Sequence, residues 1–147
     1  MNKIVTTILT AATLFTASCA TNKELAKTPD GGNPLSFSCN NSTVTAKLKG
    51  NSSTGYSWQY KLKDSKIAKY VSDEYTANQQ NSESPMIGQG GVHTFVFEGI
   101  KPGTTYVVFD YAQHWKKGKK AGVRIMMIMV DDQLKATAAE VNVGGQK

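Results

Sequence analysis

The chain has 147 residues, of which 39% are apolar and 19% are charged, and its formal net charge is +6. This length fits one domain, and the composition is that of an ordinary globular protein with a hydrophobic core. Six basic residues lie between Lys101 and Arg124. Because no recognition helix and no repeated pattern of basic and aromatic residues accompanies them, we interpret them as a solvated hairpin and expect no nucleic-acid partner.

The first residues of the chain indicate export. Met1–Lys3 gives a basic start, Ile4–Phe15 is an apolar and threonine-rich run, and small residues follow up to Cys19. The run is too short for a transmembrane helix, so we predict a signal peptide over 1–18. The cysteine resembles that of a bacterial lipobox, although Thr16 stands where Leu is usual. We therefore expect lipidation of Cys19; the alternative is a plain signal peptide that is cut nearby.

A lipid on Cys19 would anchor the exported protein to a bacterial membrane. Ala20 stands in place of the Asp that often keeps bacterial lipoproteins in the inner membrane. The outer membrane or the periplasm is therefore favoured over the cytoplasm. Residues 19–34 are polar and turn-prone, which indicates a tether. Acylation would leave Cys39 as the remaining thiol, so we expect no internal disulfide and interpret Cys39 as a small buried apolar group.

From Leu35 onward the pattern is typical of short β-strands. Period-two alternation, β-branched and aromatic residues, and intervening turn residues mark them. Strands are expected at 35–39, 43–48, 56–62, 92–98, 104–111 and 123–130, with a broken, edge-like strand at 67–71 and 74–76. We expect Trp58, Phe95 and Phe97 in the core. The strand at 123–130 is almost wholly apolar, so it should be central and covered on both faces.

About seven short strands separated by turns predict an all-β fold, an immunoglobulin-like antiparallel β-sandwich over residues 35–131. A small barrel is the alternative. The remaining residues, 132–147, form a C-terminal tail. A weak helical period at Gln133–Val141 favours a short helix there.

Three connections should meet at one end of this sandwich. The turn at 50–55, the polar loop at 77–91 and the basic loop at 112–122 join strands two to three, four to five and six to seven. Alternate connections fall at the same end of such a fold, as in antibody variable domains. The polar loop is also long for a compact domain, which favours a functional or a disordered segment.

The sequence lacks the patterns of an enzyme or of a metal protein. It contains no Gly-x-Ser-x-Gly, no P-loop and no dinucleotide fingerprint. Nothing marks Cys39 as an activated nucleophile, and the two histidines, His93 and His114, lack metal-ligand spacing. We therefore expect no enzymatic activity, no cofactor and no metal.

Each of the three loops carries a short motif. Residues 51–56 read Asn-Ser-Ser-Thr-Gly-Tyr, residues 88–91 read Gly-Gln-Gly-Gly, and residues 111–115 read Tyr-Ala-Gln-His-Trp. In this order they resemble the Asn-Pro-x-Thr-Gly-Tyr, Gly-x-Gly-Gly and Arg-Pro-Trp motifs of the chagasin family, immunoglobulin-like inhibitors of papain-type cysteine peptidases. The resemblance runs from about residue 35 to 130. Ser52 replaces the proline of the first motif, and Gln-His replaces the Arg-Pro of the third.

The resemblance implies a monomer that reversibly inhibits papain-like cysteine peptidases, with the three loops blocking the active-site groove. The glycine loop would lie nearest the catalytic thiol, and Trp115 would be the anchor. The peptidase-binding residues that it implies are Ser53, Thr54, Gly55, Gly88, Gln89, Gly90, Gly91, His114 and Trp115. The alternative, from another class, is a non-enzymatic immunoglobulin-like surface lipoprotein that binds a different partner through the same loops.

Overall fold

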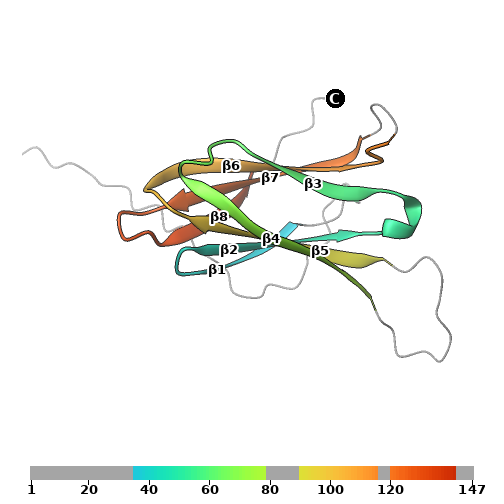
Figure 1. Cartoon of the computed structure of the whole chain (residues 1–147), viewed down its shortest axis with the longest axis horizontal. Coiled ribbons are helices and arrows are strands. Elements are labelled where there is room, and N and C mark those ends of the chain that lie inside the picture. Colours follow the sequence, from blue (N-terminus) through green and yellow to red (C-terminus); the bar gives the residue numbers. More distant parts are fainter. Residues whose placement is uncertain (1–34, 79–89, 116–119, 142–147) are drawn as a thin grey trace, which may run out of the picture.

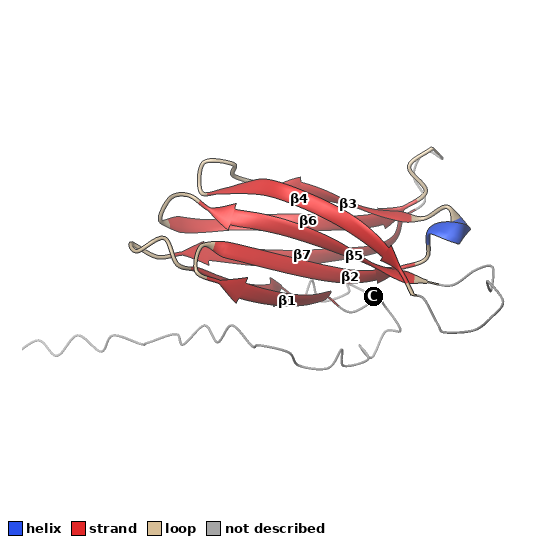
Figure 2. Ribbon diagram, turned by 60° about the horizontal axis from the view of Figure 1, so that its bottom comes forward, coloured by secondary structure: helices blue, strands red, loops and turns tan. Residues whose placement is uncertain are grey.

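The computed structural model describes residues 35–78, 90–115 and 120–141. These residues form a sandwich of two antiparallel four-stranded sheets (Figures 1 and 2). The predicted all-β sandwich is confirmed, and the two separate sheets exclude a closed barrel. Residues 1–34, for which a signal peptide, lipidation of Cys19 and a tether are predicted, lie outside the described residues, as do Gly88 and Gln89.

Each sheet takes its strands from both halves of the domain. The order in the first sheet is β1 (Leu35–Asn40), β2 (Thr43–Gly50), β5 (Gly91–Gly99) and β4 (Ala68–Ala77). The order in the second sheet is β3 (Ser57–Leu62), β6 (Gly103–Ala112), β7 (Lys120–Val130) and β8 (Ala136–Val141). A short 3-10 helix, η1 (Ser52–Thr54), joins β2 to β3. In the part of the chain that the structure describes, no helix has the length and apolar character to cross a membrane.

Alternating side chains of both sheets fill the core. Phe95 and Phe97 on β5 pack across the sandwich against Phe109 on β6, with ring centroids 5.2 and 6.2 Å away from that of Phe109. Trp58 on β3 is 4% exposed, so the predicted core positions of all three residues are confirmed. Burying a large apolar side chain contributes about 1.5–3 kcal/mol. This core gives the strand ends, and hence the loops, a rigid support.

β7 is central in its sheet, but only one of its faces is covered. Met126, Ile128 and Val130 are buried, whereas Val123 is 39% exposed and Met127 is half-buried. The prediction that this strand is covered on both faces is therefore wrong. A sandwich has two layers, so the outer face of each sheet has no further layer to cover it.

The segment expected as a short helix is a strand. β8 pairs antiparallel with β7 along its whole length. Its buried residues, Ala136 and Ala138, alternate with half-buried ones, so the period is two and not 3.6. The sandwich consequently continues past Asp131 as far as Val141.

The fourth strand is continuous and not broken into two pieces. β4 runs from Ala68 to Ala77, and a register shift between Tyr70 and Ser72 marks a bulge in its pairing with β5. Bulges are common at sheet edges, where they disturb the row of free backbone groups that another chain could pair with. The prediction of an edge strand is confirmed, because β4 is the last strand of its sheet.

Cys39 packs against the core, but it is not a free thiol. The side chain is half-buried beside the core cluster, as the sequence suggests. The structure has Cys39 disulfide-bonded, so the expectation of a chain without a disulfide is wrong. The sequence contains one other cysteine, Cys19, which lies outside the described residues.

The sandwich brings the described parts of the three predicted loops to one end, on the right of Figure 1. Gly50, the last residue of β2, pairs with Gly91, the first residue of β5. Ser57, the first residue of β3, pairs with Ala112, the last residue of β6. The turn between β2 and β3 therefore has the start of β5 on one side and the end of β6 on the other.

Candidate functional site

The first loop is a single 3-10 turn that closes on its own polar side chains. The Asn51 Oδ1 atom accepts hydrogen bonds from the Ser53 backbone N–H at 3.1 Å and from the Ser53 hydroxyl at 2.6 Å. The Thr54 hydroxyl donates to the Asn51 carbonyl at 2.6 Å. Gly55 ends the turn with a φ of 77°, a left-handed conformation that favours glycine. The Asn-x-x-Thr-Gly spacing thus builds the turn, and Ser53 and Thr54 lie exposed on it.

The third loop lies directly against the first. The Gln113 side chain donates from Nε2 to the Thr54 carbonyl at 3.1 Å, and His114 Nε2 donates to the Ser57 carbonyl at 3.1 Å. The Trp115 ring covers Gly55 so closely that a Cβ on that glycine would lie 2.6 Å from Cζ2 of the tryptophan. Two loops far apart in sequence therefore form one braced surface, which we call the loop 1–loop 3 surface (Ser53–Gly55 and Gln113–Trp115).

Trp115 is the most prominent side chain of that surface. It is 65% exposed, the highest value among the large apolar residues that the structure describes. A tryptophan that is held in place and still faces solvent suits an interface anchor. The predicted residues Ser53, Thr54, Gly55, His114 and Trp115 are thus brought together.

The glycine loop contributes Gly90 and Gly91, which occupy different environments. Gly90 is half-buried, and a Cβ on it would lie 3.1 Å from the Gly50 carbonyl oxygen. Gly91 is buried within the β5 pairing, where a Cβ would lie 2.5 Å from the Tyr75 hydroxyl oxygen. Gly91 is therefore needed for packing under the loop and is not an exposed contact residue. The backbone bond from Asn78 N–H to the Gly90 carbonyl, at 2.9 Å, closes the base of the loop.

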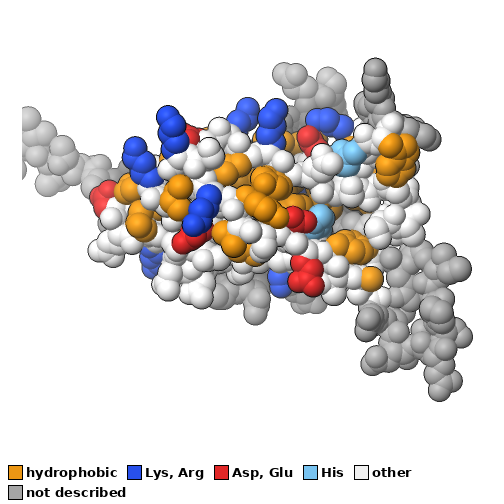
Figure 3. All heavy atoms as spheres, viewed as in Figure 1, with side chains coloured by type: hydrophobic (Ala, Val, Ile, Leu, Met, Phe, Trp, Pro, Cys, Tyr) orange, Lys and Arg blue, Asp and Glu red, His pale blue; other side chains and the backbone are white. Residues whose placement is uncertain are grey.

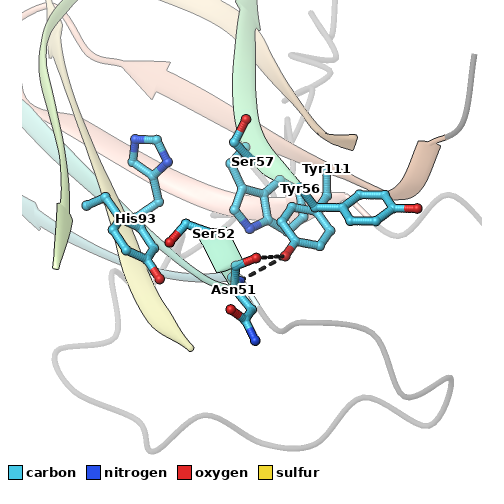
Figure 4. Close-up of a pocket in the computed structure, with 9 residues that line it drawn as sticks. Asn51, Ser52, Tyr56, Ser57, His93 and Tyr111 are labelled. Carbon is cyan, nitrogen blue, oxygen red and sulfur yellow. Dashed lines mark hydrogen bonds between the residues drawn. The ribbon is translucent and has the colours of Figure 1, made fainter. Parts of the chain in front are cut away.

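Tyr111 fixes the first loop to the second sheet. Its hydroxyl accepts a hydrogen bond from the Asn51 backbone N–H at 2.8 Å, as Figure 4 shows. Its ring packs against the rings of Tyr56 and Trp58, at centroid distances of 5.4 and 4.9 Å. The Trp58 indole N–H in turn donates to the Lys49 carbonyl at 2.8 Å. Sequence reasoning missed this support, although the tyrosine at the start of the third motif is a signal for it.

A hydrogen-bonded cluster on β4 and β5 carries the perturbed acid–base groups. The Tyr70 hydroxyl donates to the Asp73 carboxylate, and His93 Nε2 lies 2.7 Å from the other carboxylate oxygen. These two bonds hold the pKa of Asp73 below its ordinary value, and the bond to Asp73 raises the pKa of Tyr70 to about 12. Among the described residues, no group of three or more His, Cys, Asp or Glu side chains could hold a metal ion.

On the face that Figure 3 shows, apolar side chains lie both at the loop end and along the sandwich, and most of the coloured Lys and Arg side chains lie away from the loop end. Lys116, Lys117 and Lys119, which follow Trp115 in the sequence, lie outside the described residues.

Comparison with known proteins identifies the family. The model of the chagasin family of peptidase inhibitors, I42, matches residues 39–127. The chain belongs to this family. Membership confirms the resemblance seen in the three loop motifs, and it agrees with the expectation that the chain is not an enzyme.

Two similar proteins come from Entamoeba histolytica. Amoebiasin-2 is 27% identical over 85 residues, which span 54% of this chain and 63% of Amoebiasin-2. The crystal structure of the cysteine protease inhibitor EhICP2 matches with a TM-score of 0.48 and 21% identity, over 68% of this chain and 78% of that one. The match to Amoebiasin-2 thus spans somewhat less than two thirds of that relative's length.

Proposed function

We propose that this protein is a reversible inhibitor of papain-like cysteine peptidases and that its loop end blocks their active-site groove. The observation that carries the proposal is the loop 1–loop 3 surface, on which an exposed tryptophan is held over the Thr-Gly turn. Family membership supports it, since that family is described as peptidase inhibitors.

The chemistry of the target explains why such a surface inhibits without being cut. A papain-like enzyme attacks with a thiolate at the bottom of a groove. The glycine loop offers backbone with almost no side chains, so it can approach the thiolate closely. Inhibition needs only that no carbonyl carbon reaches attack geometry while the loops occupy the groove.

The braces lower the cost of binding. A loop that is already ordered loses little conformational entropy on association. Each side chain that is already immobilised lowers the entropic cost of binding by about 0.5–1.5 kcal/mol. Before any partner binds, Gln113 holds the third loop on the first, and His114 holds it on Ser57 at the start of β3. Trp115 is therefore presented in one arrangement, and its truncation should cost about 2 kcal/mol, or about thirtyfold in affinity.

Titration of papain with the purified protein tests the proposal. We expect inhibition that reverses on dilution and that weakens about thirtyfold in Trp115→Ala. Tyr106→Ala is the matched control, because Tyr106 is an exposed aromatic residue (41%) on β6 and lies away from the loop end. Absence of inhibition at micromolar concentrations, or equal losses in both variants, would overturn the proposal.

We also propose that the protein is exported as a monomer and held at a bacterial membrane through a lipid on Cys19. Leu35 pairs with Leu48, two residues before the end of β2, so the tether would leave the sandwich near its loop end. The structure has Cys39 disulfide-bonded, and lipidation excludes an intrachain bond between Cys39 and Cys19, because each needs the sulfur of Cys19. The anchor therefore requires that the exported chain carry no such bond. The mass of the exported protein, measured without reduction, distinguishes the two.

A further inference from the structure

Two tyrosines meet across one side of the sandwich, away from the three loops. β3 and β4 are edge strands of different sheets, and they lie along the same side of the molecule (Figure 2). β3 pairs with β6 and β4 pairs with β5, so side chains make the contact between them. Tyr60 on β3 and Tyr70 on β4 stack their rings there, with centroids 4.7 Å apart and an interplanar angle of 11°.

The core holds this pair in place while solvent reaches it. The Tyr60 ring lies edge to face with the buried rings of Phe95 and Phe97, at centroid distances of 5.8 and 5.5 Å. The Tyr70 ring contacts Phe97 in the same way at 6.2 Å. Tyr60 is nevertheless 36% exposed and Tyr70 is half-buried. The two phenols are thus fixed next to each other and accessible from outside.

A carboxylate stands ready for the proton of one phenol. The Tyr70 hydroxyl donates to Asp73, whose other carboxylate oxygen lies 2.7 Å from His93 Nε2. These bonds hold the pKa of Asp73 below its ordinary value, so the carboxylate is ionised at neutral pH. A phenol that loses an electron becomes a strong acid, and a base within hydrogen-bond reach speeds the loss of its proton. Tyr70 is therefore placed for one-electron oxidation.

We propose that Tyr60 and Tyr70 form an oxidative cross-linking site, at which a haem peroxidase with hydrogen peroxide joins the two rings as dityrosine and Asp73 accepts the phenolic proton of Tyr70. Each phenol loses one electron and its hydroxyl proton, and the two radicals form a bond between ring carbons ortho to the oxygens. The hydrogens on those carbons then move to the phenol oxygens, so the product lacks two hydrogen atoms. Hydrogen peroxide takes up the two electrons and two protons and becomes two molecules of water.

The chain contains a second tyrosine pair that serves as an internal comparison. The rings of Tyr56 and Tyr111 are tilted by 31° and their centroids are 5.4 Å apart. The Tyr111 hydroxyl is bonded to the backbone of Asn51 and not to a carboxylate. We therefore expect the bond at Tyr60 and Tyr70 to form first. That bond would join the two sheets covalently and restrict the unfolded chain as a disulfide does.

The test treats the full-length chain with a haem peroxidase and hydrogen peroxide. Dityrosine is followed by its blue fluorescence, and tryptic peptides are mapped by mass spectrometry. Trypsin cuts after the lysines between the two tyrosines, Lys61, Lys63, Lys66 and Lys69, so each tyrosine falls in its own peptide. We expect these two peptides to be joined, with a combined mass two hydrogen atoms lower, in a chain that still migrates as a monomer on a denaturing gel.

Three variants separate the proposal from general oxidation. Tyr60→Phe and Tyr70→Phe should each abolish the joined peptide, whereas Tyr106→Phe, which changes an exposed tyrosine on β6 outside the pair, should leave it unchanged. Absence of the joined peptide from the wild type would overturn the proposal. A first product that joins Tyr56 to Tyr111, or two chains to each other, would also overturn it.

Asp73→Asn keeps both tyrosines and removes the proton acceptor. We expect the cross-link to form about tenfold more slowly in this variant, and equal rates would overturn the role of Asp73. Papain titration of the untreated chain reports separately on inhibition. Failure of the cross-link and failure of the proposed function are therefore distinguishable.

Discussion

Gly55→Ala tests whether the first loop positions the tryptophan of the third. The substitution places a Cβ 2.6 Å from Trp115 Cζ2, so the indole must move. It also puts an alanine at a φ of 77°, which costs about 1–2 kcal/mol in the left-handed region. Because Trp115 is 65% exposed, the ring can swing outward without disturbing the core. We therefore expect a loss of unfolding free energy of about 1–2 kcal/mol and a loss of affinity for papain of tenfold to about thirtyfold.

The assay is the inhibition constant for papain, measured beside urea unfolding of the same preparations. Gly103→Ala is the matched control. Gly103 also has a positive φ, 145°, and a Cβ there would lie 2.9 Å from Ile67 Cδ1. Gly103 begins β6, at the opposite end of the sandwich from the loops. We expect that variant to lose stability and to inhibit normally. If Gly55→Ala inhibits like the wild type while Trp115→Ala does not, the contact between the two loops does not position the tryptophan, and the reasoning is refuted.

Three further predictions concern the bond between the two loops, the acid–base cluster at Asp73 and the lipid on Cys19. Gln113→Ala removes the bond to the first loop and should weaken papain inhibition about fivefold, as expected for one hydrogen bond; an unchanged inhibition constant would show that this brace does not matter. The pKa of Asp73 is lowered in the folded state, so the stability it contributes is present above its unfolded pKa and is lost as the pH falls through its folded pKa. The difference in unfolding free energy between the wild type and Asp73→Asn should therefore shrink below about pH 4, and a constant difference down to pH 2 would contradict this. Mass spectrometry of the exported protein should find the acyl chains on Cys19, whereas a lipid-free chain with an intact bond to Cys39 would disprove the anchor.

The strands that the sequence predicts well are those whose signal is local. Trp58, Phe95 and Phe97 alternate with polar residues inside single strands, so their faces can be read without knowing their neighbours. β8 was missed because its Ala-rich sequence has little intrinsic strand preference. It becomes a strand by pairing with β7, and that contact cannot be seen in the segment itself.

In the site, too, contacts between distant segments cannot be predicted from one segment. The motifs indicate which loops are functional, but they do not distinguish the roles of the four residues at 88–91. Pairing and packing separate them: Gly91 makes room for Tyr75 inside the sheet, while Gly90 lies where the described part of the loop begins. The bond from Gln113 to Thr54 joins residues 59 positions apart, so nothing in either segment alone predicts it.

The two departures from the family pattern are best understood together. The sequence lacks a proline at Ser52 and at His114, and each loss removes a fixed φ that would have stiffened its loop. In this chain, hydrogen bonds restrict the two loops in place of the missing prolines. The first loop closes on the Asn51 side chain. The third loop is bonded to the first through Gln113, and to Ser57 at the start of β3 through His114. A proline restricts only the loop that contains it, whereas these contacts restrict two loops together. A substitution in either loop should therefore change the position of Trp115.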